Sequence, residues 1–163
     1  LFGYQSFDGV EPDVMTLAKA LGSGAPLGAF CTKDFCSVLE PGDHGSTFGG
    51  NALTTSAGAA AADYMVKNNI PTMALNSGIY MREKLTYLKE TVDQITEIRG
   101  MGLLIGVEMQ QEISATIVGE AVNKGLLINA VRPNMIRFMP PLNVSKDEID
   151  QAVSILESIY KTL

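Results

Sequence analysis

Ile95-Thr96-Glu97-Ile98-Arg99-Gly100-Met101-Gly102-Leu103-Leu104-Ile105-Gly106-Val107-Glu108-Met109 is the stretch that decides the fold. Its apolar segments, 95–98 and 103–109, predict two strands. The glycines of segment 99–102 predict a tight turn between them, because glycine accepts the positive φ that such turns need. The stretch therefore predicts a strand, a turn and a strand.

Downstream of this stretch, the pattern alternates between helix and strand. Segment 113–123 predicts an amphipathic helix that ends before Gly125. Segments 126–128 and 135–138 predict two further strands. The order strand, strand, helix, strand, strand, helix is typical of a two-layer α/β unit.

The last helix has the clearest local signal. Ser145 and Glu148 form the spacing of a capping box, in which each residue satisfies a backbone N–H of the first turn. Apolar residues then recur at helical spacing and predict a face that packs on a core; they are Ile149, Ala152, Val153, Leu156, Ile159 and Tyr160.

Upstream, an alanine-rich segment predicts a helix that begins near Asn51 and ends near Asn69. Pro71 suits the first turn of a second helix. We expect the core-facing side of that helix to carry Leu75, Ile79, Leu85, Leu88 and Val92, with Arg82 at its edge. The first fifty residues are rich in glycine and proline, and Val14–Ala18 and Gly28–Thr32 predict two short buried strands.

Composition excludes several classes of function. The chain has 163 residues and a net charge of −6, which gives no electrostatic footprint for nucleic acid. No apolar run has the roughly 18 residues that a membrane span needs. Cys31 and Cys36, with a single histidine, predict reduced thiols in a cytoplasmic protein and neither a disulfide framework nor a metal site. The start at Leu1 lacks a methionine and a signal-like segment, so we expect a processed or truncated product.

Lys19 is the first candidate for chemistry. Its neighbours from Val14 to Leu21 are mostly apolar. An apolar environment disfavours an ammonium ion, so it lowers the pKa of a lysine and makes the amine a nucleophile. The alternative is a surface lysine at the end of a strand, which is the commoner case.

The segment from His44 to Asn51 is the second candidate. Ser46 and Thr47 supply hydroxyl groups among flexible glycines, just before a predicted helix, and this combination suits a phosphate. The alternative is a loop that only caps the helix. We assign His44 no role.

Arg137 and Arg99 are the remaining candidates. Arg137 lies inside an apolar strand, where a buried guanidinium needs a carboxylate or a phosphate; that partner is either a ligand or a structural ion pair. For Arg99 we favour a structural role beside the glycine turn.

Four segments in this order resemble class III pyridoxal-phosphate aminotransferases. The segment similar to their lysine segment is Phe7-Asp8-Gly9-Val10-Glu11-Pro12-Asp13, continuing to Leu17-Ala18-Lys19-Ala20-Leu21-Gly22-Ser23-Gly24. Gly45-Ser46-Thr47-Phe48-Gly49-Gly50-Asn51 is similar to their phosphate loop. Segments 98–106 and 136–142 resemble two motifs of their small domain.

The resemblance implies roles for four residues. Lys19 matches the Schiff-base lysine that binds pyridoxal 5'-phosphate covalently and also moves a proton. Thr47 matches a threonine that reaches the phosphate of the cofactor in the other subunit of a homodimer, and Ser46 matches a position near the substrate. Arg137 matches the arginine that binds a substrate carboxylate. No catalytic role carries over to Arg99.

The resemblance also implies a fold and a reaction. Residues 1–50 correspond to the end of the large domain of a fold type I enzyme, 51–70 to a connecting helix and 71–163 to the small C-terminal α/β domain. The implied substrates are N2-acetylornithine and 2-oxoglutarate, as in arginine biosynthesis, and the alternative donors are ornithine, succinylornithine or another ω-amino acid. The family's pyridine-stacking aromatic residue, its pyridine-pairing aspartate and its second substrate arginine have no match here, so we expect an inactive C-terminal fragment. A non-enzymatic α/β association module is the alternative.

Overall fold

The computed structural model describes residues 2–163. The chain divides into two compact units, Leu1–Asn69 and Ile70–Leu163. The predicted division into 1–50, 51–70 and 71–163 stays a prediction, and its first residue lies outside the described range. Each unit is described by itself below.

The first unit is built on a two-stranded antiparallel sheet. Strand β1 (Val14–Leu17) pairs with β2 (Ala29–Thr32), with Val14 opposite Thr32. Three 3-10 helices accompany it, namely η1 (Gly3–Ser6), η2 (Lys19–Gly22) and η3 (Asp34–Cys36). Both strands are confirmed, but the prediction that they are buried is wrong, since Val14 and Phe30 are 44% and 53% exposed. The reason is that two strands alone bury little apolar surface.

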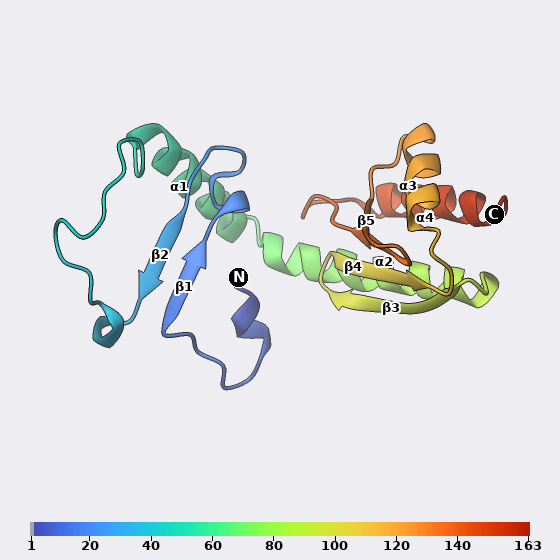
Figure 1. Cartoon of the computed structure of the whole chain (residues 1–163), viewed down its shortest axis with the longest axis horizontal. Helices are drawn as coiled ribbons and strands as arrows, with labels where there is room; N and C mark the ends of the chain where they lie inside the picture. Colours follow the sequence, from blue (N-terminus) through green and yellow to red (C-terminus); the bar gives the residue numbers. More distant parts are fainter. Residues whose placement is uncertain (1) are drawn as a thin grey trace. The chain divides into compact units, whose positions relative to one another are not determined.

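Helix α1 (Ala52–Lys67) completes the first unit (Figure 1). The Asn51 Oδ1 atom accepts a hydrogen bond of 3.1 Å from the Thr54 N–H, which explains why the helix begins there. Helix η2 packs against α1 at Gly58, where an added Cβ would lie 3.2 Å from the Leu21 carbonyl oxygen. Gly58 therefore permits the close approach of the segment that follows Lys19.

The second unit is a two-layer α/β sandwich. Its antiparallel sheet has the strand order β3-β4-β6-β5, formed by β3 (Ile95–Met101), β4 (Leu104–Met109), β5 (Asn129–Arg132) and β6 (Met135–Phe138). Helices α2 (Ile70–Thr91), α3 (Ser114–Asn123) and α4 (Lys146–Tyr160) pack on one face of this sheet (Figure 1). The predicted element order is confirmed, as is the mixed α/β fold class. The most deeply buried side chains include Leu85, Ile105, Val107, Ile117, Ile136 and Leu156.

The predicted ends of the helices are confirmed. The Ser145 Oγ atom accepts from the Glu148 N–H, and Glu148 Oε2 accepts from the Ser145 N–H at 2.8 Å, so α4 begins with the expected capping box. Gly125 follows α3 with φ of +81°. In the range 2–163, we find no helix with the length and apolarity that crossing a bilayer requires.

Two predicted strand boundaries are wrong. Strand β3 continues through Arg99 to Met101, so the turn lies at Gly102 and Leu103, where the φ of Gly102 is +55°. The strand predicted at 126–128 is absent, and β5 instead begins at Asn129. The Leu126 N–H donates to the Ala121 carbonyl at 2.8 Å, so this segment closes the end of α3 and cannot pair as a strand.

The predicted core face of α2 is correct only in its second half. Leu85, Leu88 and Val92 are buried, but Leu75 and Ile79 are 48% and 42% exposed. Ala74, Gly78 and Met81 face the core instead, and they have the same spacing. The small residues are the buried ones because the β3–β4 turn packs directly on the helix. A Cβ atom at Gly78 would lie 2.8 Å from the Gly102 Cα atom.

Replacing Gly78 with alanine is therefore expected to destabilise the second unit. The added methyl group would overlap the backbone of Gly102 and force the helix and turn apart. Overpacking of this kind costs about 1 to 3 kcal/mol, which thermal or urea unfolding would measure. Gly119→Ala is the matched control, because this helical glycine has open space around it and gains helix propensity. Equal stability of the two variants would contradict the proposed close packing.

Candidate functional site

Lys19 lies directly after strand β1, at the start of η2. The extended residue Ala18 precedes it, and its own φ is +54°. A positive φ is uncommon for residues other than glycine and is found where the surroundings impose it, often at functional sites. The fold thus holds the Lys19 backbone in a strained conformation.

The side chain of Lys19 is exposed. Within residues 2–163, no carboxylate forms an ion pair with its Nζ atom and no hydrogen bond engages it. The apolar environment that the sequence predicts around this amine is therefore not supplied by the described residues. By contrast, Lys33, at the other end of the two-stranded sheet, lies 3.1 Å from Asp13. Lys19 is thus available to a ligand, whereas Lys33 is held by a carboxylate.

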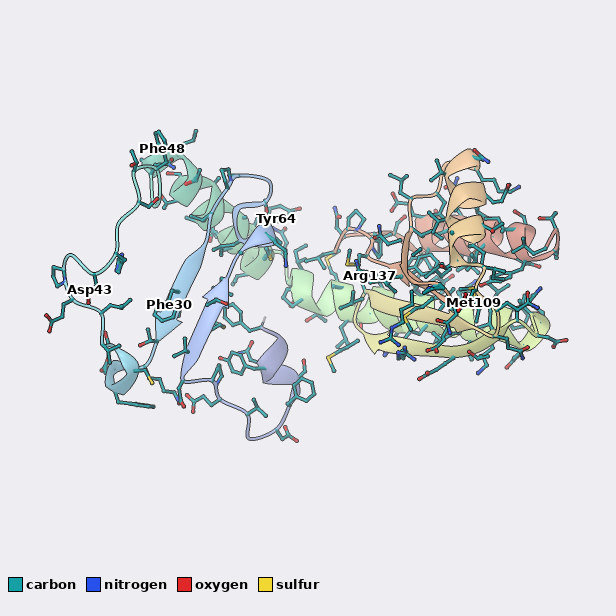
Figure 2. The ribbon with its side chains drawn as sticks, viewed as in Figure 1. Phe30, Asp43, Phe48, Tyr64, Met109 and Arg137 are labelled. Atoms are coloured by element: carbon teal, nitrogen blue, oxygen red, sulfur yellow. The ribbon has the colours of Figure 1, made fainter. Side chains whose placement is uncertain are left out.

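The loop before α1 contains the predicted phosphate-binding residues. The Ser46 Oγ atom accepts a hydrogen bond of 2.9 Å from the Gly49 N–H, so Ser46 stabilises the loop itself. The Thr47 side chain is exposed, and no hydrogen bond to its hydroxyl is found among the described residues. Figure 2 shows the neighbouring Phe48 at the tip of the loop, where its side chain is 83% exposed. Thr47 is the residue of this loop with a free hydroxyl.

Lys19 and Thr47 belong to segments that meet different parts of α1. The helix η2 that begins at Lys19 packs near Gly58, in the middle of α1. The loop that carries Thr47 leads into the first turn of α1 at Ala52 (Figure 1). The rise of an α-helix separates these two points by about 9 Å.

Arg137 lies on β6, on the sheet face opposite to the helices. Its neighbours Ile136 and Phe138 point into the core, and alternation places Arg137 and Met135 on the other side. We call this the polar face of the sheet; strand register assigns it Glu97, Arg99, Gly106, Glu108, Asn129, Arg132, Met135 and Arg137. Figure 2 labels Arg137 on this sheet.

The guanidinium of Arg137 is a partly buried cation of the polar face with no partner among the described residues. Its Nε atom is buried and has no hydrogen-bond partner, and none of the ion pairs formed by residues 2–163 includes it. The structural ion pair considered from the sequence is therefore not formed by the described residues. A buried donor without a partner is costly, so this position favours an external acceptor such as a carboxylate.

Arg99 has the structural pairing that the sequence favoured. Its Nη1 atom donates to Glu97 and, at 2.6 Å, to Glu108. The hydrogen bond that Arg99 donates to Glu108, reinforced by the one that it donates to Glu97, raises the pKa of Arg99 above its ordinary value, while partial burial opposes this. Arg99 is thus a satisfied cation, in contrast to Arg137.

Sequence reasoning missed two features of these sites. The positive φ of Lys19 has no signal in its residue type, because lysine rarely adopts it. Gly106 lies opposite both Arg99 and Arg137 and leaves a gap between the two arginines. An apolar run that contains a glycine offers a weak signal for such a gap.

The described residues fit a cofactor that has an aldehyde and a phosphate. Lys19 supplies a free amine at a strand end, and Thr47 supplies a free hydroxyl in a glycine-rich loop. Both groups have the chemistry that pyridoxal phosphate needs from a protein. Arg137 adds an unpartnered donor suited to a carboxylate.

Comparison with known proteins supports the resemblance. The family model described as aminotransferase class-III matches residues 1–160. The acetylornithine aminotransferase of Caldanaerobacter subterraneus subsp. tengcongensis is 46% identical over 163 residues, which is all of this chain and 41% of that protein. The enzyme of the same name from Streptococcus mutans is 40% identical over 162 residues, or 42% of its length. The chain thus spans about two fifths of the relatives that it matches.

Solved structures of aminotransferases are similar to this chain. The acetylornithine aminotransferase from Elizabethkingia anophelis superposes with a TM-score of 0.86 and 32% identity, covering 94% of this chain and 42% of that one. The S-selective transaminase from Bacillus megaterium gives a TM-score of 0.90 and 28% identity, covering 99% of this chain and 40% of that one. These likenesses confirm the predicted aminotransferase fold. The chain belongs to the class III aminotransferases, a family whose members depend on pyridoxal phosphate.

Proposed function

We propose that this chain serves in an acetylornithine aminotransferase, which transfers an amino group between N2-acetylornithine and 2-oxoglutarate in arginine biosynthesis. The observation that carries the proposal is the 46% identity over the whole chain to a protein of that name. Ornithine and succinylornithine are the alternative donors, because both carry the same terminal amine as N2-acetylornithine. The enzyme would act in the cytoplasm.

Lys19 is the residue proposed to hold the cofactor and to move the proton. Its Nζ atom is exposed and unpaired, so it can bind the aldehyde carbon of pyridoxal phosphate. When bound, the cofactor supplies a ring that stabilises negative charge at the substrate Cα. Lys19 Nζ would take the proton from the Cα atom of the amino donor in the first half of the reaction. It would give a proton to the Cα atom of the acceptor in the second half.

Thr47 and Ser46 are proposed to serve a neighbouring site. Lys19 and Thr47 lie in segments that meet α1 about 9 Å apart along its axis. This separation is compatible with a homodimer in which the Thr47 hydroxyl donates to the phosphate held by the other subunit. Ser46, which fixes the Gly49 N–H, would shape the loop on the substrate side.

Arg137 is proposed to bind a substrate carboxylate. A planar guanidinium binds a carboxylate through two parallel hydrogen bonds, and the free Nε atom of Arg137 is one such donor. Glutamate and 2-oxoglutarate both carry the carboxylate that this interaction needs. Binding would satisfy the buried donor and orient the substrate at the same time.

The test compares substrates, and it uses the protein in the form in which its source organism makes it. The protein, loaded with pyridoxal phosphate, is given 2-oxoglutarate with N2-acetylornithine, ornithine or succinylornithine, and glutamate is measured. The proposal predicts the highest kcat/KM for N2-acetylornithine. Faster turnover of either other donor would reassign the substrate, and no glutamate from any donor would reject the function.

The 163-residue chain by itself is expected to form no glutamate in this assay. It has no match to the aspartate and the aromatic residue that the family uses to hold and protonate the pyridine ring. An unoriented ring gives little stabilisation of charge at Cα. Turnover by the purified chain above the rate of free cofactor would show that these residues are replaced from within the chain.

A further inference from the structure

Arg137 lies near a carboxylate that it does not bind. Strand register places Gly106 opposite Arg137 and Glu108 opposite Met135, two residues away. Glu108 and Arg137 are therefore diagonal neighbours on the polar face, about 7 to 8 Å apart at the backbone, a separation that long side chains span. Of the strand residues on this face, only Glu97 and Glu108 carry carboxylates.

Both oxygens of Glu108 are engaged by other residues. The Arg99 Nη1 atom donates to Oε2 at 2.6 Å, and the Asn134 Nδ2 atom donates to Oε1 at 3.3 Å. The hydrogen bond from Arg99 is the main cause that holds the pKa of Glu108 below its ordinary value, while partial burial opposes it. The charge of Arg132, on the neighbouring strand, lowers this pKa further.

Arg99 is itself held in place by two further contacts. It also pairs with Glu97, and its Nη2 atom lies 3.8 Å from the Met135 Sδ atom. Gly106 lies opposite Arg99 on β4 and has no side chain, so the Arg99 side chain can lie over β4 and reach Glu108, its diagonal neighbour on that strand. Met135 occupies the space beside Gly106, with its Sδ atom 3.6 Å from where a Cβ would be.

We infer that Arg99 and Asn134 are positioning residues, which hold Glu108 away from Arg137 so that the Arg137 guanidinium stays free for a substrate carboxylate. Without them Glu108 would turn along the polar face and form the ion pair that Arg137 lacks. A built-in carboxylate would then compete with the substrate. That the competing ligand is a substrate carboxylate rests on the proposed function. Which arginine pairs with Glu108 does not depend on it.

The direct test follows the pKa of Glu108 by carboxyl NMR in the 163-residue chain, without any ligand. Arg137→Gln is expected to leave this pKa as in the wild type, because the two side chains are not paired. Arg99→Gln is expected to keep the pKa below its ordinary value, because Arg137 takes the place of Arg99. Only the double variant, Arg99→Gln with Arg137→Gln, is expected to raise it toward the ordinary value. Arg132 and Asn134 are present in all four proteins, so their effects cancel.

The inference is overturned if Arg99→Gln alone raises the pKa as far as the double variant does. It is equally overturned if Arg137→Gln alone changes the pKa, since the two groups would then already interact. Unchanged amide signals of the core residues Ile105 and Val107 establish that each variant is folded. Arg99→Lys, which keeps a cation, is the conservative control and is expected to behave like the wild type.

A second measurement separates this inference from the proposed function. In the protein as its source makes it, Arg99→Gln is expected to raise the KM for 2-oxoglutarate about two- to fivefold, the size of an exposed ion pair, with kcat unchanged. Adding Glu108→Gln is expected to restore the KM. A raised KM that Glu108→Gln does not restore overturns the inference. An unchanged KM together with the expected pKa pattern instead shows that Arg137 does not bind the substrate.

Discussion

Replacing Lys19 with alanine is expected to abolish transamination in the protein as its source makes it. The variant loses the Nζ atom that we propose both holds the cofactor and moves the proton at the substrate Cα. General acid–base catalysis alone contributes about 10²- to 10⁴-fold, so we expect kcat to fall by at least about 10²-fold from the loss of proton transfer alone. Glutamate formation from N2-acetylornithine and 2-oxoglutarate would measure the loss.

The same variant is expected to retain cofactor without a covalent bond. Borohydride treatment followed by peptide mass spectrometry should find the pyridoxyl label on Lys19 in the wild type and on no lysine in Lys19→Ala. Lys67→Ala is the matched control, because Lys67 is an exposed lysine of the same unit that pairs only with Asp63. Normal turnover by Lys19→Ala, or a label on another lysine in the wild type, would remove Lys19 from the role.

Replacing Arg137 with leucine is expected to weaken use of 2-oxoglutarate by about 10²- to 10⁴-fold in kcat/KM. Two hydrogen bonds to a charged group each contribute about 1.5 to 3 kcal/mol, and both are lost. The fold should tolerate the change, because Arg137 lies on the polar face and forms no ion pair with the described residues. Steady-state kinetics with varied 2-oxoglutarate would measure the effect.

Two further variants make this test specific. Arg137→Lys keeps the charge but not the planar fork, so it should recover only part of the lost activity. Arg132→Leu is the matched control, since Arg132 is an exposed arginine on the adjacent strand. Equal losses in Arg132→Leu and Arg137→Leu would point to the general charge of the sheet and away from a defined carboxylate site.

Local signals in the sequence predicted the elements well where a single residue type decides the outcome. Asn51, the Ser145 capping box and Gly125 each act within one turn of a helix, and the structure confirms all three boundaries. Hydrogen bonds of this range depend on neighbours along the chain. They can therefore be predicted without knowledge of the rest of the fold.

Predictions failed where two parts of the chain compete for the same space. The helical spacing of α2 fits both Leu75–Ile79 and Ala74–Gly78, and hydrophobicity alone favours the larger residues. The structure buries the smaller pair because the backbone of Gly102 approaches the helix at Gly78. In the same way, the apolar segment 126–128 suits a strand, but the N–H of Leu126 is already used by the end of α3.

The same contrast between local sequence signals and tertiary contacts applies to the candidate functional residues. The order and wording of four motifs pointed to Lys19, Thr47, Ser46 and Arg137, and to the aminotransferase family that the comparisons confirm. Whether Arg99 and Arg137 are paired or free was not determined by their residue type. The register of β3, β4 and β6 places Glu108 diagonal to both arginines. The side-chain contacts decided the pairing, because Glu97 and Glu108 both accept from Arg99, whereas the buried Nε atom of Arg137 has no partner.

The amino-acid sequence by itself determined the family, the mixed α/β class and the ends of the main helices, because these depend on residue types at fixed spacings. Only the tertiary structure decided which face of α2 is buried, that Lys19 adopts a positive φ, and that the buried Nε atom of Arg137 has no partner. The physical reason is that burial, backbone strain and ion pairing depend on which distant segments come into contact. Such contacts are set by the packing of the whole unit and not by any local pattern.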